Sequence, residues 1–360
     1  MLTASPETSR PIPHRLIVTP LAMMALGACG DPTPVPAPAA SPDTFDDVRL
    51  TDDLPAPELA PTFADADVDV APAPAAPDAP DDLGDPRPPW LWPGEDRPVA
   101  VYYPPNPPAA HERPPLLVLL HGFGASGAIQ DAYLGVAREA TALGWVVLTP
   151  DGTKNGVGKR FWNASPSWCC DFEQRGIDDV GYLTDLIDHA TTRLGTDPDR
   201  VALLGHSNGG YMAHRMACAR APRIAAFASL AGGLPLSAAD CAPERPVPAL
   251  HIHGTLDPVV YYLGQVGTYV GAEEVVRRWA TYNGCTDPDL SASEDRHDYE
   301  ATLPLSETVS LAAAGCPAPA ELWRITGGAH VPAFRDTFMP DVLAWLAAAM
   351  PGDQGAGGPR

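Results

Sequence analysis

Residues 201–211 read Val-Ala-Leu-Leu-Gly-His-Ser-Asn-Gly-Gly-Tyr, and this stretch decides the fold. An apolar run leads into Gly-x-Ser-x-Gly, and a segment with helical periodicity follows. This is the pattern of a nucleophile elbow, a strand-to-helix turn so tight that only glycine fits at positions 205 and 209. The turn predicts that Ser207 stands above a sheet edge and that the Asn208 amide, at a helix start, faces an oxyanion beside it. A glycine-rich helix start that only packs closely is the alternative.

Short apolar runs alternate with helix-periodic segments on both sides of this stretch. The runs lie at 99–103, 116–120, 146–149, 201–204, 226–230, 250–253 and 322–325, and the helix-periodic segments at 128–143, 177–194, 208–219, 272–282 and 337–349. Strands that are apolar throughout are buried on both faces, and strand–helix alternation is typical of crossover connections. The sequence therefore predicts one α/β domain over residues 90–350, with a mostly parallel central sheet and helices on both faces.

Three further stretches are too long for simple connections, and they lie at 152–176, 256–271 and 284–319. Long loops in a compact domain are usually functional, and those that follow the carboxyl ends of parallel strands border the ligand crevice. We therefore expect Phe161, Trp162 and Tyr261 to line a substrate pocket. Core packing is the alternative for each of these rings.

A serine nucleophile needs a base to activate it, and the order after an elbow is serine, then acid, then histidine. Residues 250–257 form an apolar strand and a turn that ends in Asp257. Residues 322–330 form another strand, then small residues, then His330. We expect Ser207 to attack, His330 to carry its proton, and Asp257 to orient and stabilise the imidazolium.

The second oxyanion donor should come from the loop after an early strand. Residues 116–120 lead into His-Gly-Phe-Gly at 121–124, a turn that exposes backbone amides. We assign the amide of Phe123 as this donor beside that of Asn208. A plain turn is the alternative.

The other histidines are expected to have structural roles. His206 is next to Ser207, but adjacent side chains in an extended run point to opposite faces. His251 and His253 share a face of one strand, yet no third ligand is spaced to complete a zinc site. We therefore predict no metal and no cofactor. The remaining candidates, His189, His214 and His297, are expected to pack or to be solvated.

The first ninety residues differ in composition from the rest. Residues 31–90 contain 15 Pro, 12 Ala and 13 Asp, and such a segment cannot bury enough apolar surface to fold. The sequence predicts a signal peptide at 1–29, a Pro/Ala/Asp-rich linker without fixed structure at 30–89, and a flexible tail at 351–360.

The signal peptide ends in a pattern that resembles a bacterial lipobox. Basic residues precede the apolar stretch 16–26, and Leu-Gly-Ala-Cys follows at 26–29. The resemblance implies a lipid on Cys29, and an ordinary signal peptide with an incidental cysteine is the alternative. Both predict export, either as a periplasmic or cell-surface lipoprotein or as an extracellular protein.

Charge and hydropathy exclude two classes of partner. The chain has 23 basic and 45 acidic residues, a net charge of −22, which excludes a nucleic-acid binder that neutralises phosphates. No apolar run reaches the roughly 18–20 residues of a transmembrane helix. Membrane contact is therefore expected only through the N-terminal lipid.

Six of the seven cysteines lie in the predicted domain, and an oxidising compartment permits disulfides. We predict that Cys218 pairs with Cys241 and Cys285 with Cys316, because each pair flanks one loop excursion. The pairing of the adjacent cysteines at 169–170 is open at this point.

Several motifs together resemble one family. They are Pro-Asp-Gly at 150–152, Trp-Asn at 162–163, Cys-Cys at 169–170, Asp-Asp-Val-Gly-Tyr-Leu at 178–183, Ser-Asn-Gly-Gly-Tyr-Met at 207–212, Ala-Cys at 217–218, His-Gly-Thr-Leu-Asp at 253–257 and Gly-Gly-Ala-His at 327–330. Over residues 95–348 the chain resembles the extracellular polyhydroxybutyrate depolymerase and feruloyl esterase family of α/β-hydrolases. The resemblance implies an exported serine esterase that needs no metal. It implies a polyester, a plant polysaccharide ester or a small ester as the substrate.

The chain departs from this family in two places. Residues 121–124 read His-Gly-Phe-Gly where many relatives have Cys and Gln after His-Gly, and Val-Pro at 331–332 replaces an aromatic residue and Pro. Both lie at the acyl end of the predicted site. No polymer-binding domain is apparent.

Two other functions are open to the same sequence. A serine peptidase of the prolyl-oligopeptidase kind would need a pocket for a peptide N-terminus or a proline, and usually an extra domain. A non-enzymatic surface lipoprotein could retain the hydrolase scaffold, but the complete set of Ser207, Asp257 and His330 argues against it.

Overall fold

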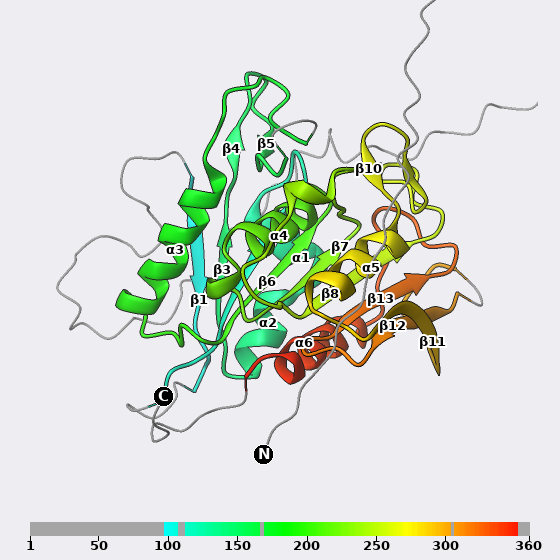
Figure 1. The fold of residues 1–360 in the computed structure, drawn as a ribbon. Coiled ribbons are helices and arrows are strands. Elements are labelled where there is room, and N and C mark those ends of the chain that lie inside the picture. The colour runs from blue at the N-terminus through cyan, green and yellow to red at the C-terminus, as the bar shows by residue number, and fades with distance from the viewer. Residues whose placement is uncertain (1–96, 107–111, 166–168, 304–305, 352–360) are drawn as a thin grey trace, which may run out of the picture. The chain divides into compact units, whose positions relative to one another are not determined.

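The structure is a computed structural model that describes residues 97–106, 112–165, 169–303 and 306–351. The predicted signal peptide, Cys29, the linker and nearly all of the tail lie outside these residues. Nine strands form one sheet in the order β1-β3-β2-β6-β7-β8-β13-β12-β11 (Figure 1). The six central strands run parallel, and they are β3 (Val146–Pro150), β2 (Leu116–Leu120), β6 (Val201–His206), β7 (Ala226–Leu230), β8 (Ala249–Gly254) and β13 (Ala320–Ile325).

The sheet ends in antiparallel strands on both sides. β1 (Val99–Tyr102) pairs with β3 at one edge. β12 (Thr308–Ala314) and β11 (Asp287–His297) extend the other edge from β13. Two short hairpins lie outside the sheet, β4 (Thr153–Lys154) with β5 (Arg160–Phe161), and β9 (Gly264–Gln265) with β10 (Tyr269–Val270).

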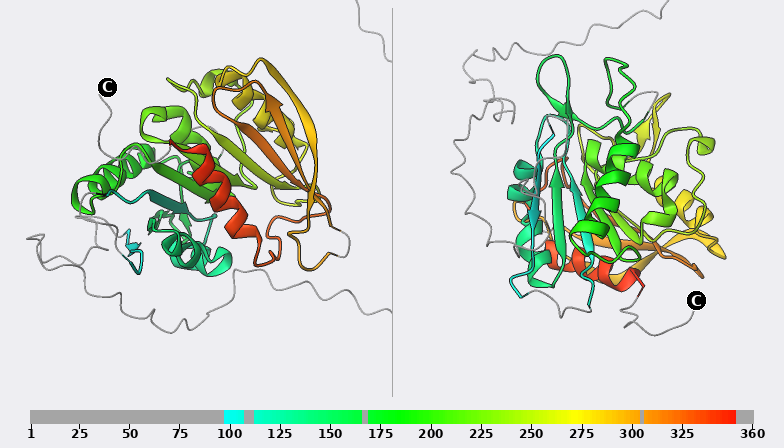
Figure 2. Two further views of the ribbon diagram at one scale, coloured as in Figure 1. Left: turned by 90° about the horizontal axis from the view of Figure 1, so that it is seen from below. Right: turned by 90° about the vertical axis from the view of Figure 1, so that its left-hand side faces the viewer.

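Helices cover both faces of the sheet (Figure 2). One face packs against α3 (Asp179–Arg193), α4 (Asn208–Ala219) and α5 (Ala272–Tyr282), and the other against α1 (Gly127–Leu134), α2 (Val136–Ala142) and α6 (Phe338–Ala349). The predicted single α/β domain with a mostly parallel sheet is confirmed. None of the helices in the described part of the chain is both long and apolar enough to cross a bilayer.

The two cores follow from strand alternation. In β2, Leu116, Val118 and Leu120 belong to the core under α3, α4 and α5, whereas Leu117 and Leu119 belong to the opposite core. Successive side chains of a strand point to opposite faces, so an all-apolar strand needs cover on both. The apolar runs of the sequence therefore became the central strands.

Two sequence expectations were wrong. The segment 128–143 is not one helix, because Gly135 takes a left-handed conformation (φ 68°) and its amide closes α1 on the carbonyl of Asp131. The segment 284–319 is not a loop but contains the antiparallel strands β11 and β12. The polar composition of β11 suits an edge strand, where charged side chains discourage pairing with other chains.

Three disulfides are present among the described residues. Cys218 pairs with Cys241 and Cys285 with Cys316, which are the two pairings expected from the sequence. The neighbouring residues Cys169 and Cys170 pair with each other. The first bridge ties the end of α4 to the segment after β7, and the second ties the two ends of the β11–β12 excursion.

Candidate active site

The turn between β6 and α4 has the geometry that the sequence predicts. Ser207 lies at φ 54° and ψ −120°, a backbone conformation that L-residues rarely adopt. A Cβ at Gly205 would lie 2.1 Å from the carbonyl oxygen of Gly209, and one at Gly209 would lie 2.1 Å from that of Leu120. Any side chain at either position would therefore push α4 away from the sheet.

Ser207, His330 and Asp257 form a continuous hydrogen-bonded series. Nε2 of His330 lies 2.9 Å from Oγ of Ser207, and Nδ1 of His330 lies 2.8 Å from Oδ2 of Asp257. The carboxylate can only accept, so Nδ1 carries the proton and Nε2 is free to accept from the serine hydroxyl. The three residues follow β6, β8 and β13, and parallel strands bring their carboxyl ends to one edge.

Asp257 is held by more donors than His330 alone. Its side chain is fully buried, and Oδ1 accepts hydrogen bonds from the amides of Val259 and Val260, both at 2.8 Å. Burial would raise the pKa of this carboxyl, but hydrogen bonds from His253, His330 and Val259 hold that pKa well below its usual value. Asp257 is therefore ionised beside His330 at neutral pH.

The amides of Phe123 and Asn208 border the serine. A Cβ at Gly122 would lie 3.5 Å from Cβ of Ser207, so the turn after β2 is in contact with the nucleophile. The Gly122 amide donates to Oε1 of Gln130 (3.1 Å) and the Gly124 amide donates to the carbonyl of Arg160 (2.7 Å). Between them, the Phe123 amide has no hydrogen-bond partner in the described part of the chain.

The side chain of Asn208 fixes the start of α4. Its Oδ1 accepts from the amide of Trp162 (2.7 Å), and its Nδ2 donates to the carbonyl of the same residue (2.9 Å). Nδ2 also lies 3.5 Å from Sγ of Cys169. This clamp sets the direction of the Asn208 amide, which, like that of Phe123, is unpaired within the described residues.

Two of the three predicted substrate contacts are wrong. The side chains of Phe161 and Trp162 are 1% and 0% exposed and belong to the core, and the Trp162 indole donates to the carbonyl of His121 (3.1 Å). Core packing, the alternative interpretation, is correct for both. Tyr261 is half exposed in the loop that follows β8, so it remains a candidate contact.

Sequence reasoning missed a pair of exposed aromatic rings beside the serine. Phe123 is 41% exposed and Phe172 is 68% exposed, and their rings meet edge to face with centroids 5.6 Å apart. The sequence held a signal for this pair, because Phe172 stands alone between Asp171 and Glu173 and has no apolar neighbour in the chain to pack with.

Further exposed apolar side chains share this edge of the sheet. They follow the carboxyl ends of β2, β3, β7, β8 and β13, the edge on which Ser207 lies. We call this set the apolar rim, and it consists of Phe123, Val157, Phe172, Leu236, Leu256, Val259, Tyr261, Leu263, Val266 and Val331. The rim offers apolar surface next to a polar reaction centre.

His206 has a role that the sequence analysis did not find. Its Nε2 donates to the carbonyl of His330 (2.9 Å), and burial lowers the pKa of its imidazole to about 4. It is therefore a neutral tether for the backbone of His330. His251 and His253 bond to each other (3.1 Å), and no cluster of three or more His, Cys, Asp or Glu side chains in the described ranges is spaced to hold a metal ion.

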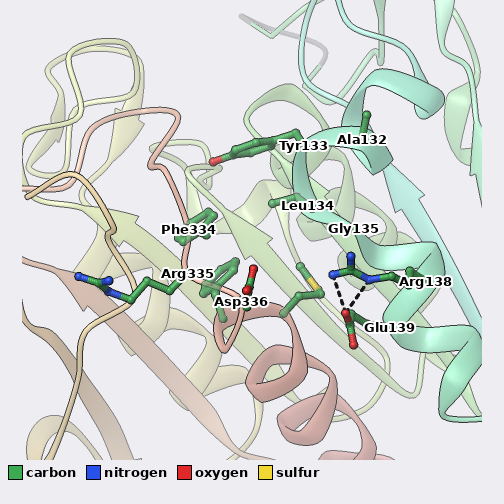
Figure 3. A pocket seen from close by; sticks show the side chains of 11 residues that line it. Ala132, Tyr133, Leu134, Gly135, Arg138, Glu139, Phe334, Arg335 and Asp336 are labelled. Atoms are coloured by element: carbon green, nitrogen blue, oxygen red, sulfur yellow. Dashed lines mark hydrogen bonds and ion pairs between the residues drawn. The ribbon is translucent and has the colours of Figure 1, made fainter. Parts of the chain in front are cut away.

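A pocket lies on the α1, α2 and α6 side of the sheet (Figure 3). Tyr133 and Phe334 line one end, and Arg138 and Glu139 form an ion pair of 2.7 Å at the other. The hydroxyl of Tyr133 also donates to the carbonyl of Pro332 (2.7 Å). The pocket is separate from the serine, but its wall anchors the segment that follows His330.

Comparisons with known proteins find esterases among the sequences that this chain resembles. A family described as phospholipase/carboxylesterase matches residues 107–276. Feruloyl esterase B of Piromyces equi is 33% identical over 48% of this chain and 33% of its own length. The putative esterase NocK of Nocardia uniformis subsp. tsuyamanensis is 34% identical over 46% of this chain and 46% of its own length. The chain thus spans less than half the length of these curated relatives.

A solved structure shares the fold. An acetyl xylan esterase from Aspergillus awamori superposes with a TM-score of 0.50 at 16% identity, over 70% of this chain and 94% of that one. At that identity the likeness is one of fold alone, and the fold is that of the α/β-hydrolases.

His121 gives a pH-dependent prediction. Its Nδ1 donates to the carbonyl of Gly122 and its Nε2 accepts from the amide of Gly152, both at 2.8 Å, and burial lowers its pKa to about 4. In the unfolded chain His121 is protonated below about pH 6.5, whereas in the folded chain it stays neutral down to about pH 4. The free energy of unfolding contributed by this ring is therefore full above pH 6.5 and decreases as the pH falls toward 4. Urea unfolding should show that His121→Gln loses about 2 kcal/mol less than wild type between pH 7 and pH 5. Equal losses in both proteins would contradict this.

Proposed function

We propose that this chain, which has the α/β-hydrolase fold and resembles esterases in sequence, hydrolyses carboxylic ester bonds through an acyl-enzyme on Ser207. The observation that carries the proposal is the series of hydrogen bonds from Ser207 through His330 to the buried Asp257. In this arrangement Nδ1 of His330 donates to Asp257, which leaves Nε2 able to accept the proton of Ser207.

The reaction begins when Oγ of Ser207 attacks the ester carbonyl carbon. Nε2 of His330 takes the serine proton as the bond forms, and Asp257 stabilises the resulting imidazolium. The negative charge moves to the former carbonyl oxygen, where the amides of Phe123 and Asn208 donate to it. These amides are held in place by their neighbours, so they need little rearrangement when the charge develops.

Collapse of this tetrahedral intermediate breaks the bond to the alcohol. His330 gives its proton to the leaving alkoxide, which departs as the alcohol and leaves an acyl group on Ser207. A water molecule then attacks the acyl carbon while His330 takes its proton. The second collapse returns that proton to Oγ of Ser207 and releases the carboxylic acid.

The apolar rim favours an ester with an apolar or aromatic acyl group. The exposed pair of Phe123 and Phe172 can pack against such a group next to the attacked carbon, and Tyr261 contributes from the loop after β8. Feruloyl or acetyl groups on plant polysaccharide, short polyesters and small esters all fit this class.

We also propose that the protein is exported and carries an N-terminal lipid on Cys29. The three disulfides support an oxidising compartment.

The serine is the most direct test of the proposed function. Ser207→Ala removes the nucleophile, so kcat/KM on p-nitrophenyl acetate and butyrate should fall by about 10³-fold or more. Ser126→Ala is the matched control, because that hydroxyl caps α1 and takes no part in the reaction. Unchanged turnover in Ser207→Ala would refute the assignment. Faster cleavage of peptide anilides than of esters would favour a peptidase.

The aromatic pair is tested by its effect on acyl preference. Phe172→Ala should lower kcat/KM on methyl ferulate about 10-fold, since it removes apolar contact with the acyl ring, and should change p-nitrophenyl acetate hydrolysis less. Leu143→Ala removes another exposed apolar side chain, 57% exposed and outside the rim, and should change neither. An equal loss on both esters would contradict a contact with the acyl ring.

A further inference from the structure

A column of buried rings leads to the side of Asp257 that faces away from solvent. His214 comes from α4, His251 and His253 from β8, and Trp279 from α5. All four side chains are at most 1% exposed. The proposed reaction uses none of them, yet Trp279 is hydrogen-bonded to His214, His251 is hydrogen-bonded to His253, and the rings of His214 and His251 pack together.

Both ends of the column fix where the protons lie. At one end, the Trp279 indole, which can only donate, lies 2.9 Å from Nδ1 of His214, so that nitrogen accepts and the proton of His214 is on Nε2. At the other end, Nε2 of His253 lies 2.8 Å from the carbonyl of Val260 and 3.4 Å from Oδ2 of Asp257. Both oxygens are acceptors, so Nε2 of His253 carries the proton.

The middle of the column follows from its ends. Nδ1 of His253 must accept, and its partner at 3.1 Å is Nε2 of His251, which therefore carries the proton of that ring. Nε2 of His214 and Nδ1 of His251 are buried without a partner in the described residues. The two rings pack against each other with centroids 5.5 Å apart, and no hydrogen bond joins them.

The N–H groups of His251 and His253 thus follow one another along β8 toward Asp257. Burial lowers the pKa of His214 to about 3 and that of His251 well below its ordinary value, so both rings are neutral at physiological pH. A flipped tautomer at His253 would aim a lone pair, instead of an N–H, at the carboxylate and at the carbonyl of Val260. That carbonyl, 2.8 Å from Nε2 of His253, opposes the flip, and the N–H of His251 donates to the Nδ1 that remains.

We propose that His253 is a positioning residue for Asp257, with a tautomer set by the carbonyl of Val260 at one nitrogen and by His251 at the other. Its Nε2–H donates to the Val260 carbonyl and also lies 3.4 Å from Oδ2, the oxygen that accepts from His330. Together with the amides of Val259 and Val260 on Oδ1, this N–H limits rotation of the carboxylate away from the imidazole. This inference rests on the proposed function for its kinetic consequence, but not for the arrangement of protons.

The proton arrangement is tested without any substrate. The full chain labelled with ¹⁵N-histidine, examined by long-range ¹H–¹⁵N NMR at pH 7, should show His214, His251 and His253 as Nε2–H tautomers. Single His→Gln variants assign the signals. An Nδ1–H tautomer or a charged ring at His253 at pH 7 would overturn the proposal, whether or not the protein cleaves esters.

The kinetic consequence is tested by two substitutions of the same ring. His253→Phe keeps a ring but has no N–H, so kcat on p-nitrophenyl butyrate should fall about 10- to 100-fold with KM nearly unchanged. His253→Gln keeps an N–H near the position of Nε2 and should restore most of kcat. Tyr262→Phe is the matched control, because its ring packs against His253 and its hydroxyl bonds Glu273 rather than Asp257.

The outcomes separate this proposal from the proposed function. A folded His253→Phe protein with wild-type kcat would overturn the positioning role, as would an equal loss in the Phe and Gln variants. Failure of the proposed function would instead appear as a wild-type protein without esterase activity. The NMR result would still test the tautomers of the three histidines.

Discussion

The close approach of α4 to the sheet is the constraint on which the rest of the site depends. Carbonyl oxygens of Gly209 and Leu120 occupy the space that a Cβ would take at Gly205 and Gly209, so only two glycines permit this packing. The approach forces Ser207 into a conformation with positive φ and lifts its hydroxyl above the sheet edge. It also places the first amide of α4 beside that hydroxyl. One steric condition thus positions the proposed nucleophile and one of its two proposed oxyanion donors.

Asp257 and His330 reach Ser207 because the parallel strands that precede them end at one edge of the sheet. Hydrogen bonds then determine the charge of Asp257 and the position of His330. Burial opposes the charge on Asp257, but donors on both oxygens outweigh it and keep the carboxyl ionised. The backbone of His330 is held by His206 and by the pocket wall at Tyr133. The site therefore combines rigid support for its polar groups with an exposed apolar rim where a substrate can approach.

The sequence predicted the parts of this structure that follow from local residue patterns and from the order of motifs along the chain. The apolar runs became central strands because such runs need cover on both faces, and the order of Ser207, Asp257 and His330 located three residues that the fold brings together. Phe161 and Trp162 were misplaced because an aromatic residue in a long loop can turn into the core as readily as toward solvent. The edge strand β11 was missed because it is mostly exposed and gives no apolar pattern, and β12, between β13 and β11, because its core side chains Val309 and Leu311 alternate with less buried residues. The buried histidine column could not be predicted, since it joins α4, β8 and α5 across the core.

Covalent labelling shows whether Ser207 is an activated nucleophile. We expect a fluorophosphonate probe to add once to the full chain by intact mass, and peptide mapping to place the adduct on Ser207. We also expect His330→Ala to slow the labelling strongly, because the serine then lacks its base. A folded protein that takes up no probe, or takes it up at another residue, would contradict the role of Ser207 as the nucleophile.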